Sequence, residues 1–400
     1  MYMKKVPIAP LSLVDDVATI SECNTIASID TNVKNDVFVK TKKMQLQVAK
    51  GKCQYIHCGN GECPSSYYAD NTRLGEVDRA KYLGDMVSFD WDVLYDTRAD
   101  KAVGYSVQCL AMASEISLGY RIFSVAVTLY KAIFLSGTLL NMETWPHCTE
   151  QRLQKFERIE QNYFRKILQC HSKAALESIY LSMGVLPFRF HLMKRRITYY
   201  KLLLQRSEDE VTRKVVMAQK ENILPGDFYI QVRENMATLS ITESDLLLNS
   251  EETLKQILDD KISKAAFSYL LTRADKHSKT RNSLYSNMNG CSYLKNPRFT
   301  TDISRLLFML QTRTYGVKNN FRNHYKNEDL WCPLCSGEGE NLEKQIDNQE
   351  HLFECTVLVG SPDNLPCVYE DIFSENLETL LIAGQVSQEI LLTRDILLDN

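Results

Sequence analysis

The sequence has no long uninterrupted hydrophobic run and no secretory signal peptide. Its most apolar stretch, residues 116–140, contains Arg121, Lys131 and several serine and threonine residues, which is typical of a buried helix and not of a membrane span. We therefore expect no membrane partner. Without a secretory signal, the 12 cysteines are expected to be reduced thiols or metal ligands in a nuclear or cytoplasmic protein, and not a disulfide framework.

The chain also lacks internal repeats and low-complexity segments, and its net charge is only −3 over 400 residues. This small total hides a strong asymmetry along the chain. Residues 151–330 carry 30 basic and 19 acidic side chains, whereas residues 331–400 carry 2 and 14. A basic segment of this kind suits a surface that binds a polyanion, and it equally suits a solvated helix face that binds nothing.

Several segments have the pattern of a sheet followed by helices. Residues 6–20 indicate two strands joined by a turn, residues 23–48 indicate a helix, and residues 80–88 indicate a further strand. From residue 96 to 205 the apolar residues recur at helical spacing. A second helical block spans residues 207–280, where loop-forming residues predict breaks at Leu224-Pro-Gly226 and at Asn249-Ser250.

The most specific local motif lies near the C-terminus. Cys332 and Cys335 form a CxxC pair, and His351 and Cys355 follow after fifteen residues with the spacing of one helical turn. A CxxC turn places two thiolates on one side of a tetrahedral ion, and a His four residues before a Cys supplies two ligands from one helix face. The motif predicts a structural Zn²⁺ site, and the plainer interpretation is two buried thiols beside a surface histidine.

Two adjacent carboxylates, Asp15 and Asp16, lie at the turn of the first predicted hairpin. Carboxylates gathered in this way can hold the paired cations of phosphoryl transfer. Taken alone, such a pair is more often ordinary turn chemistry.

The surroundings of this pair resemble the acidic hairpin of reverse transcriptases, in particular those of non-LTR, LINE-like retrotransposons. The similar stretches are residues 10–21 around the acids, 50–59 and 81–85 after them, and then the helical stretches 133–145, 153–168 and 184–200. These look like the end of the palm and the thumb helices of that family. A CCHC motif near the C-terminus is also typical of many of its members.

The resemblance implies that Asp15 is a ligand of catalytic Mg²⁺ and that Asp16 is its neighbour in the site. In the family, a second catalytic aspartate lies on an earlier strand, together with the fingers. Neither is present upstream of Asp15, so we expect Mg²⁺ to bind only in an intact palm. We expect this chain by itself not to polymerise.

Two basic segments are candidate nucleic-acid surfaces. In the second, the cations alternate with Tyr315, Phe321 and Tyr325, which suits phosphate contacts combined with base stacking. At helical spacing, an equally good interpretation is that the aromatic rings lie in the core and the basic side chains form a solvated helix face. The candidate phosphate ligands are Arg189, Lys194, Arg195, Arg196 and Lys201 in the first segment and Arg313, Lys318, Arg322 and Lys326 in the second.

Together these features predict an α+β chain that is predominantly α-helical, with a partial α/β palm, a thumb-like helical bundle and a small C-terminal zinc module. The expected function is that of a fragment of an RNA-directed DNA polymerase that binds RNA and DNA (element RNA and primer-template) and has no evident small-molecule substrate. The alternatives are a zinc-stabilised helical interaction protein without catalysis, and a fragment whose palm is encoded upstream. The predicted divisions are 1–95 for the palm, 96–206 for the thumb, 207–312 for a helical connection, 313–360 for the basic segment and zinc motif, and 361–400 for an acidic tail.

Overall fold

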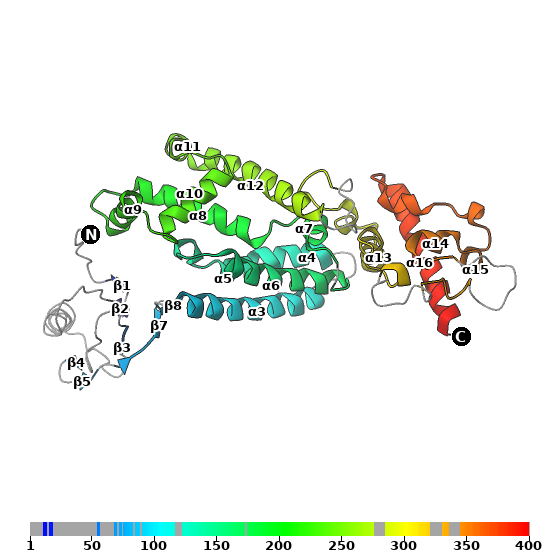
Figure 1. The fold of residues 1–400 in the computed structure, drawn as a ribbon, viewed down its shortest axis with the longest axis horizontal. Coiled ribbons are helices and arrows are strands. Elements are labelled where there is room, and N and C mark those ends of the chain that lie inside the picture. The colour runs from blue at the N-terminus through cyan, green and yellow to red at the C-terminus, as the bar shows by residue number, and fades with distance from the viewer. Residues whose placement is uncertain are drawn as a thin grey trace. The chain divides into compact units, whose positions relative to one another are not determined.

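The computed structural model shows a predominantly helical protein with a few short strands near the N-terminus (Figure 1). This confirms the predicted excess of helix over strand. The residues that the structure describes are 11–13, 16–18, 54–56, 68–69, 72–73, 75–82, 85–88, 90–116, 122–172, 174–275, 285–320, 330–335 and 345–399.

The first hairpin forms between two of the predicted strand segments. Strand β1 (Leu11–Leu13) pairs antiparallel with β2 (Asp16–Ala18), and Leu13 stands opposite Asp16. The short strand β3 (Gln54–Tyr55) pairs in parallel with β6 (Gly75–Glu76). The helix predicted at residues 23–48 lies outside the described residues.

The strand predicted at residues 80–88 is instead a hairpin. Strand β7 (Arg79–Tyr82) pairs antiparallel with β8 (Asp85–Ser88), and Tyr82 stands opposite Asp85. A Gly beside the polar Asp85 favours a turn, and this local signal outweighs the continuous apolar pattern on either side. The remaining described strands, β4 (Tyr68–Ala69) and β5 (Thr72–Arg73), form a small hairpin.

The first long helix begins earlier than residue 96, where the sequence pattern indicates its start. Helix α3 begins at Trp91, and its first turn is capped by the side chain of Asp90, which accepts from the backbone N–H of Asp92. Breaks in the helices fall where predicted, between α9 and α10 and between α11 and α12. The α-helices from α3 to α12 are α3 (Trp91–Ile116), α4 (Ile122–Leu129), α5 (Ser136–Thr138), α6 (Glu150–Leu168), α7 (Leu176–Met183), α8 (Phe188–Gln205), α9 (Val211–Glu221), α10 (Phe228–Thr238), α11 (Glu243–Leu248) and α12 (Glu251–Ala274).

The chain divides into two compact units. The first comprises residues 1–101, 141–152 and 196–235, and the second comprises residues 102–140, 153–195 and 236–400. The predicted boundaries at 95 and 206 therefore do not coincide with the divisions between these units. Local composition marks where helices end, whereas packing between distant segments decides which helices share a core.

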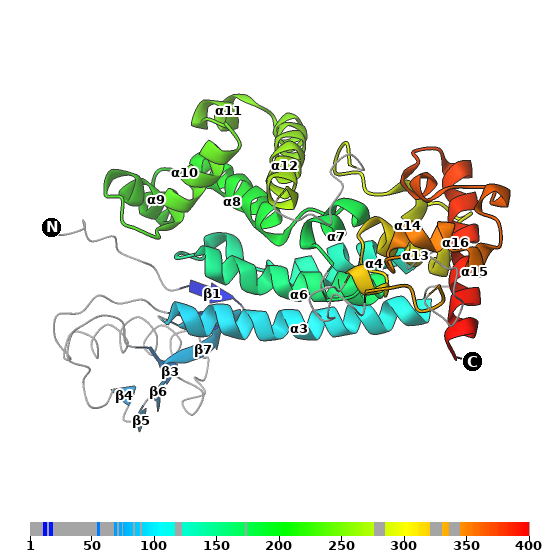
Figure 2. The same cartoon turned by 45° about the vertical axis from the view of Figure 1, so that its right-hand side comes forward.

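In the second unit, α4 and α6 lie side by side (Figures 1 and 2), and the hydroxyl of Tyr163 donates to the carbonyl of Ala126 at 2.8 Å. Helix α4 continues into a π-helical turn, Tyr130–Leu135. Widening of the helix at this turn accompanies the burial of Tyr130 and Phe134, which are fully enclosed.

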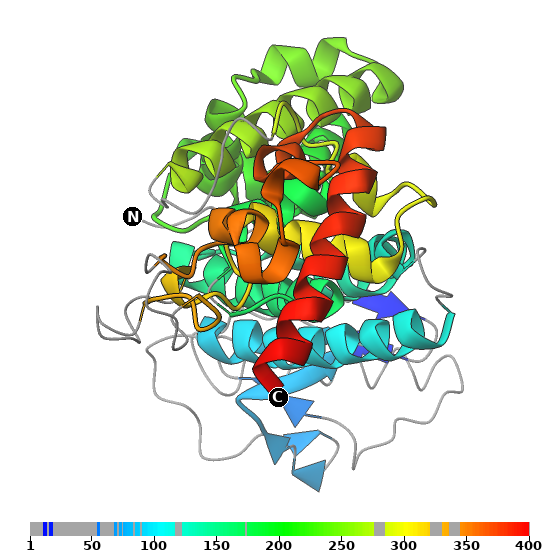
Figure 3. The ribbon, with the colours of Figure 1, turned by 90° about the vertical axis from the view of Figure 1, so that its right-hand side faces the viewer.

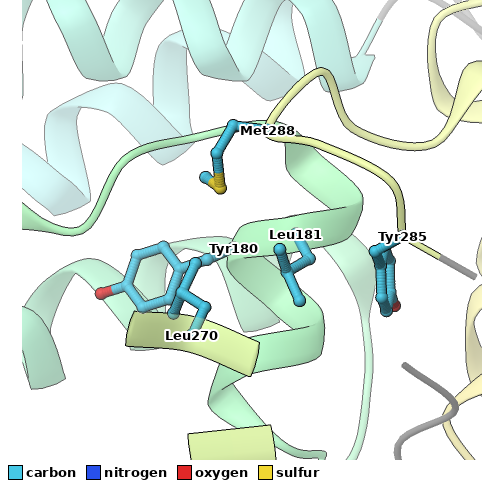
Figure 4. Packing of buried hydrophobic residues seen from close by; sticks show 5 residues of the cluster. All are labelled: Tyr180, Leu181, Leu270, Tyr285 and Met288. Carbon is cyan, nitrogen blue, oxygen red and sulfur yellow. The ribbon is translucent and has the colours of Figure 1, made fainter. Parts of the chain in front are cut away.

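Helix α7 packs against α12 in the same unit through an apolar cluster. Tyr180 and Leu181 of α7 meet Leu270 of α12, and Tyr285 and Met288 from the following segment close the cluster (Figure 4). The buried hydroxyl of Tyr285 is paired with that of Ser182 at 2.9 Å, so the ring enters the core without an unsatisfied polar group.

The C-terminal residues are a packed helix, although the acidic composition of 361–400 predicts a tail. Helix α16 (Leu377–Asp399) lies against α13 (Thr301–Gln311) and α14 (Gln349–Glu354) (Figure 3). Its buried face includes Leu380, Ala383, Ile390 and Leu391. The apolar residues recur at helical spacing within an acidic segment, and that periodicity decides the structure more than net charge does. Helix α15 (Thr356–Val359) lies between α14 and α16 in the sequence.

The contact between α13 and α16 depends on a glycine. A Cβ added at Gly384 would lie 2.6 Å from Cγ2 of Ile303 and 3.3 Å from Cδ1 of Leu307. We expect Gly384→Ala to lower the free energy of unfolding by about 1–3 kcal/mol, because overpacking outweighs the gain in helix propensity. The midpoint of urea unfolding of the full chain measures this change.

A matched control is Gly104→Ala in α3, where an added Cβ meets nothing within 4 Å. This exposed helical position should gain up to about 1 kcal/mol from the same substitution. Equal effects of the two substitutions would contradict the assignment of Gly384 as a packing residue.

Candidate metal centre

The four residues of the CCHC motif come together in the second unit. Their ligand atoms all lie within 4.8 Å of one another, and each residue is buried, with exposed fractions of 3% for Cys332, 4% for Cys335, 5% for His351 and 0% for Cys355. The Sγ of Cys335 lies 3.3 Å from Nε2 of His351 and 3.3 Å from Sγ of Cys355. In a tetrahedral site with bonds of about 2.0–2.3 Å, neighbouring ligand atoms are about 3.5–3.8 Å apart, so this cluster can bind a metal ion.

Local structure brings each pair into place. Cys332 follows an isolated antiparallel bridge between Trp331 and Ile346, and its backbone N–H donates to the carbonyl of Gln345 at 2.8 Å. His351 lies in the first turn of α14 and Cys355 caps its C-terminal end, where the N–H of Cys355 donates to the carbonyl of His351 at 2.8 Å. The spacing of four residues therefore places both ligands on one helix face, as the sequence predicts.

The start of α14 is fixed by its own cap. The side-chain oxygen of Asn348 accepts the backbone N–H of His351 at 2.7 Å, which satisfies a donor that the helix leaves without a partner. His351 is itself a candidate ligand, so this cap also helps to position its imidazole.

The thiols of the cluster influence one another's protonation. A hydrogen bond with Cys355 and burial raise the pKa of Cys332 to about 12, whereas the same hydrogen bond lowers the pKa of Cys355. Burial raises the pKa of Cys335. A divalent cation bound by these thiols would displace their protons.

A buried ion pair connects the segment before α14 to the C-terminal helix. Asp347 is fully buried, and its carboxylate accepts from the guanidinium of Arg394 on α16 at 2.9 Å and from the backbone N–H of Lys318 at 2.8 Å. Its backbone N–H donates to the carbonyl of Leu330 at 2.8 Å. Asp347 lies four residues before His351, so α16 helps to hold the loop that carries the ligands.

Two of the predicted cations next to this centre contact residues close to the four clustered side chains. The Nζ of Lys318 donates to the carbonyl of Trp331 at 3.2 Å. Arg313 lies 3.5 Å from a carboxylate oxygen of Glu350, and both side chains are about 40% exposed, so this pair contributes little to stability. Arg322 and Lys326 lie outside the described residues.

The predicted cations of α8 do not form an open basic surface. Arg196 and Lys201 are buried, with exposed fractions of 4% and 3%, and Arg196 donates to the carbonyl of Trp145 at 3.1 Å. Arg189 forms a two-pronged ion pair with Glu157, and Lys194 pairs with Asp259. Arg195 is half-buried. The helical spacing that groups these cations in the sequence also turns several of them toward the core.

The acidic pair of the first hairpin is only partly described. Asp16 begins β2, opposite Leu13, whereas Asp15 lies outside the described residues. Among the side chains that the structure describes, the Cys332, Cys335, His351 and Cys355 group is the one cluster of three or more metal-binding residues.

A buried carboxylic acid is a polar centre that sequence reasoning missed. Glu160 of α6 is fully enclosed, and its carboxylate accepts from the hydroxyls of Tyr130 and Tyr180 and from the backbone N–H of Phe188 at 3.2 Å. Burial raises the pKa of Glu160 to about 8, although the hydrogen bonds oppose the increase. One signal was available, because Glu160 lies four residues from both Phe156 and Phe164 and so shares their apolar helix face.

None of the helices in the described part of the chain combines the length and the apolar character that a membrane span requires. Compared with protein-family models, curated proteins and solved structures, the chain matches none of them.

Proposed function

We propose that this chain is an RNA-binding segment of a non-LTR retrotransposon reverse transcriptase, with its C-terminal module held together by a structural zinc ion. The observation that carries the proposal is the convergence of Cys332, Cys335, His351 and Cys355 on one buried point. The order of the features along the chain, from the β1–β2 hairpin through the helices to this centre, supports the same family.

The donor set favours zinc among the common metals. Three thiolates and one imidazole are soft or borderline ligands, which zinc prefers and which Mg²⁺ and Ca²⁺ do not. Four protein ligands fill a tetrahedral coordination shell, so the ion would have no open position for substrate or water. Its role is then to stabilise the fold.

A second candidate is a zinc-stabilised helical interaction protein that does not bind nucleic acid. One observation favours it: Arg196 and Lys201 of α8 are buried, and Arg189 and Lys194 are held by acids. The two candidates share the metal centre and differ in whether the protein binds RNA.

Binding of the zinc-loaded full chain to a structured RNA, measured from 50 to 200 mM salt, separates the two candidates. With about three to five phosphate contacts, the affinity should fall roughly 20- to 500-fold over this range, because each contact releases counterions. A folded, zinc-loaded protein that does not bind the RNA at 50 mM salt would overturn the first candidate and leave the second.

A further inference from the structure

The outer face of α16 carries large apolar side chains. The face that packs on α13 and α14 is buried, whereas Ile382, Leu392 and Ile396 on the other side have exposed fractions of 41%, 57% and 62%. In Figure 3, α16 is the red helix in the foreground, and no described element passes in front of it. Single exposed apolar residues are common on protein surfaces, but three on one helix face form a patch of the kind that contacts a partner.

Exposed positions of this face recur at a regular spacing. They are separated by three, four, three, four and three residues, which is the spacing of the contact positions in paired helices. The stripe is about 25 Å long at 1.5 Å per residue. A second helix lying along α16 would therefore meet all three apolar side chains. The positions with this spacing are Ile382, Gln385, Glu389, Leu392, Ile396 and Asp399.

The exposed charged residues that accompany this stripe are acidic. Glu389 and Asp399 lie within it, Asp395 lies at its border, and all three are exposed. Among the ion pairs of the described residues, those of α16 join Glu378 to Arg298 and Arg394 to Asp347. Within the described part of the chain, no cation pairs with the three exposed acids.

The stability of the helix does not account for these acids. The last turn of α16 contains Asp399 and no basic residue. A helix dipole is negative at this end, so an acid here is unfavourable in the protein alone. A cation supplied by a partner would remove this unfavourable interaction.

The charges decide between the possible occupants of the face. A polyanion such as RNA is repelled by Glu389, Asp395 and Asp399. A second copy of α16 brings the same acids, and its one base, Arg394, is only 6% exposed and is bound to Asp347. A second α16 therefore offers no cation to this face in either a parallel or an antiparallel arrangement.

We propose that the outer face of α16 docks a basic amphipathic helix of another protein. Apolar side chains of the partner pack on Ile382, Leu392 and Ile396, and its lysine or arginine side chains lie beside Glu389 and Asp399. This surface is separate from the metal centre, and its role does not depend on RNA binding.

The test is binding of a synthetic helical peptide to the full chain, measured by fluorescence anisotropy at low and at high salt. The probe has about 20 residues, with leucine at the heptad contact positions and lysine at the flanking positions. A control peptide has glutamate in place of each lysine. We expect the lysine peptide to bind about tenfold more tightly than the glutamate peptide, and to bind more weakly at high salt because the charges are exposed.

Two variants locate the binding on α16. Leu392→Gln with Ile396→Gln removes apolar contact, and Glu389→Gln with Asp399→Asn removes charge. Each pair should weaken binding of the lysine peptide about tenfold. All four positions are exposed, so the variants should keep the urea unfolding midpoint of wild type.

A matched control is Leu247→Gln with Leu248→Gln on α11, where the side chains are 56% and 84% exposed. This control should bind the lysine peptide within about twofold of wild type. Absence of binding, equal binding of the two peptides, or equal effects of the α16 and α11 variants would overturn the proposal. A wild-type dimer that Leu392→Gln with Ile396→Gln dissociates in sedimentation would also overturn it, because a second copy would then occupy the face.

Discussion

Replacing Cys332 and Cys335 together with serine is expected to remove the bound zinc and to unfold the segment around it. Wild type should hold one equivalent of zinc, and the double variant none. Structural zinc sites of this type bind with an apparent free energy of about 10–16 kcal/mol, which exceeds the stability of a small module. This is the largest single effect that we expect from any substitution in the chain.

The physical reason lies in the local structure. Around the centre, the described backbone is held by one isolated bridge between Trp331 and Ile346, the short helices α14 and α15, and the ion pair of Asp347 with Arg394. The apolar cluster at this point consists of the three cysteines with Leu334 and Leu358 packed against them. A core of this size is too small to keep the segment around the four ligands folded once the ion is lost.

Elemental analysis of zinc and limited proteolysis of the same samples measure the result. Cys367→Ser is the matched control, because Cys367 is also buried in the C-terminal region and is not among the four clustered residues. The control should retain its zinc. Retention of a full equivalent by the double variant would contradict the assignment of the ligands.

The second large effect concerns Glu160 and the dependence of stability on pH. The pKa of Glu160 is raised from its ordinary value of 4.5 to about 8 by burial. Between these two values the folded protein holds a proton that the unfolded chain has released. Stability therefore falls as pH rises from about 4.5 to about 8, and the contribution at stake is about 4–5 kcal/mol.

Glu160→Gln should flatten this part of the pH profile, because the amide does not ionise. The free energy of unfolding, measured by urea at several pH values from 4.5 to 8.5, tests the expectation. Glu251→Gln on the exposed start of α12 is the control, and it should leave the slope unchanged. An equally steep decline in Glu160→Gln and wild type would show that another group is responsible.

Glu160→Ala should be more harmful than Glu160→Gln at every pH. It leaves a cavity and removes the acceptor of the Tyr130 and Tyr180 hydroxyls and of the Phe188 N–H. An unsatisfied buried polar group costs about 1–3 kcal/mol, and a cavity adds to that. We expect a loss of several kcal/mol.

The sequence pattern was sufficient to predict features that depend on residues close together in the sequence. The spacing of Cys332, Cys335, His351 and Cys355 predicted one cluster, and the structure assembles it because a CxxC turn and one helical turn each place two ligands together. Two strand segments joined by a turn predicted the β1–β2 hairpin, and loop residues predicted the helix breaks after α9 and α11. These outcomes follow from backbone geometry over a few residues.

Other properties depended on contacts between residues far apart in the sequence. The basic residues of α8 and α6 look alike in the sequence. The fold buries Arg196 and Lys201 of the first and exposes Lys155 and Arg158 of the second.

The sequence by itself therefore determined the helical character of this chain, its first hairpin and the four residues of its candidate metal centre. Only the tertiary structure decided that Glu160 is buried among tyrosine hydroxyls, that α16 packs on α13, and that Lys155 and Arg158 of α6 are exposed. The physical reason is that periodicity fixes which residues share a helix face, whereas burial depends on which other element covers that face.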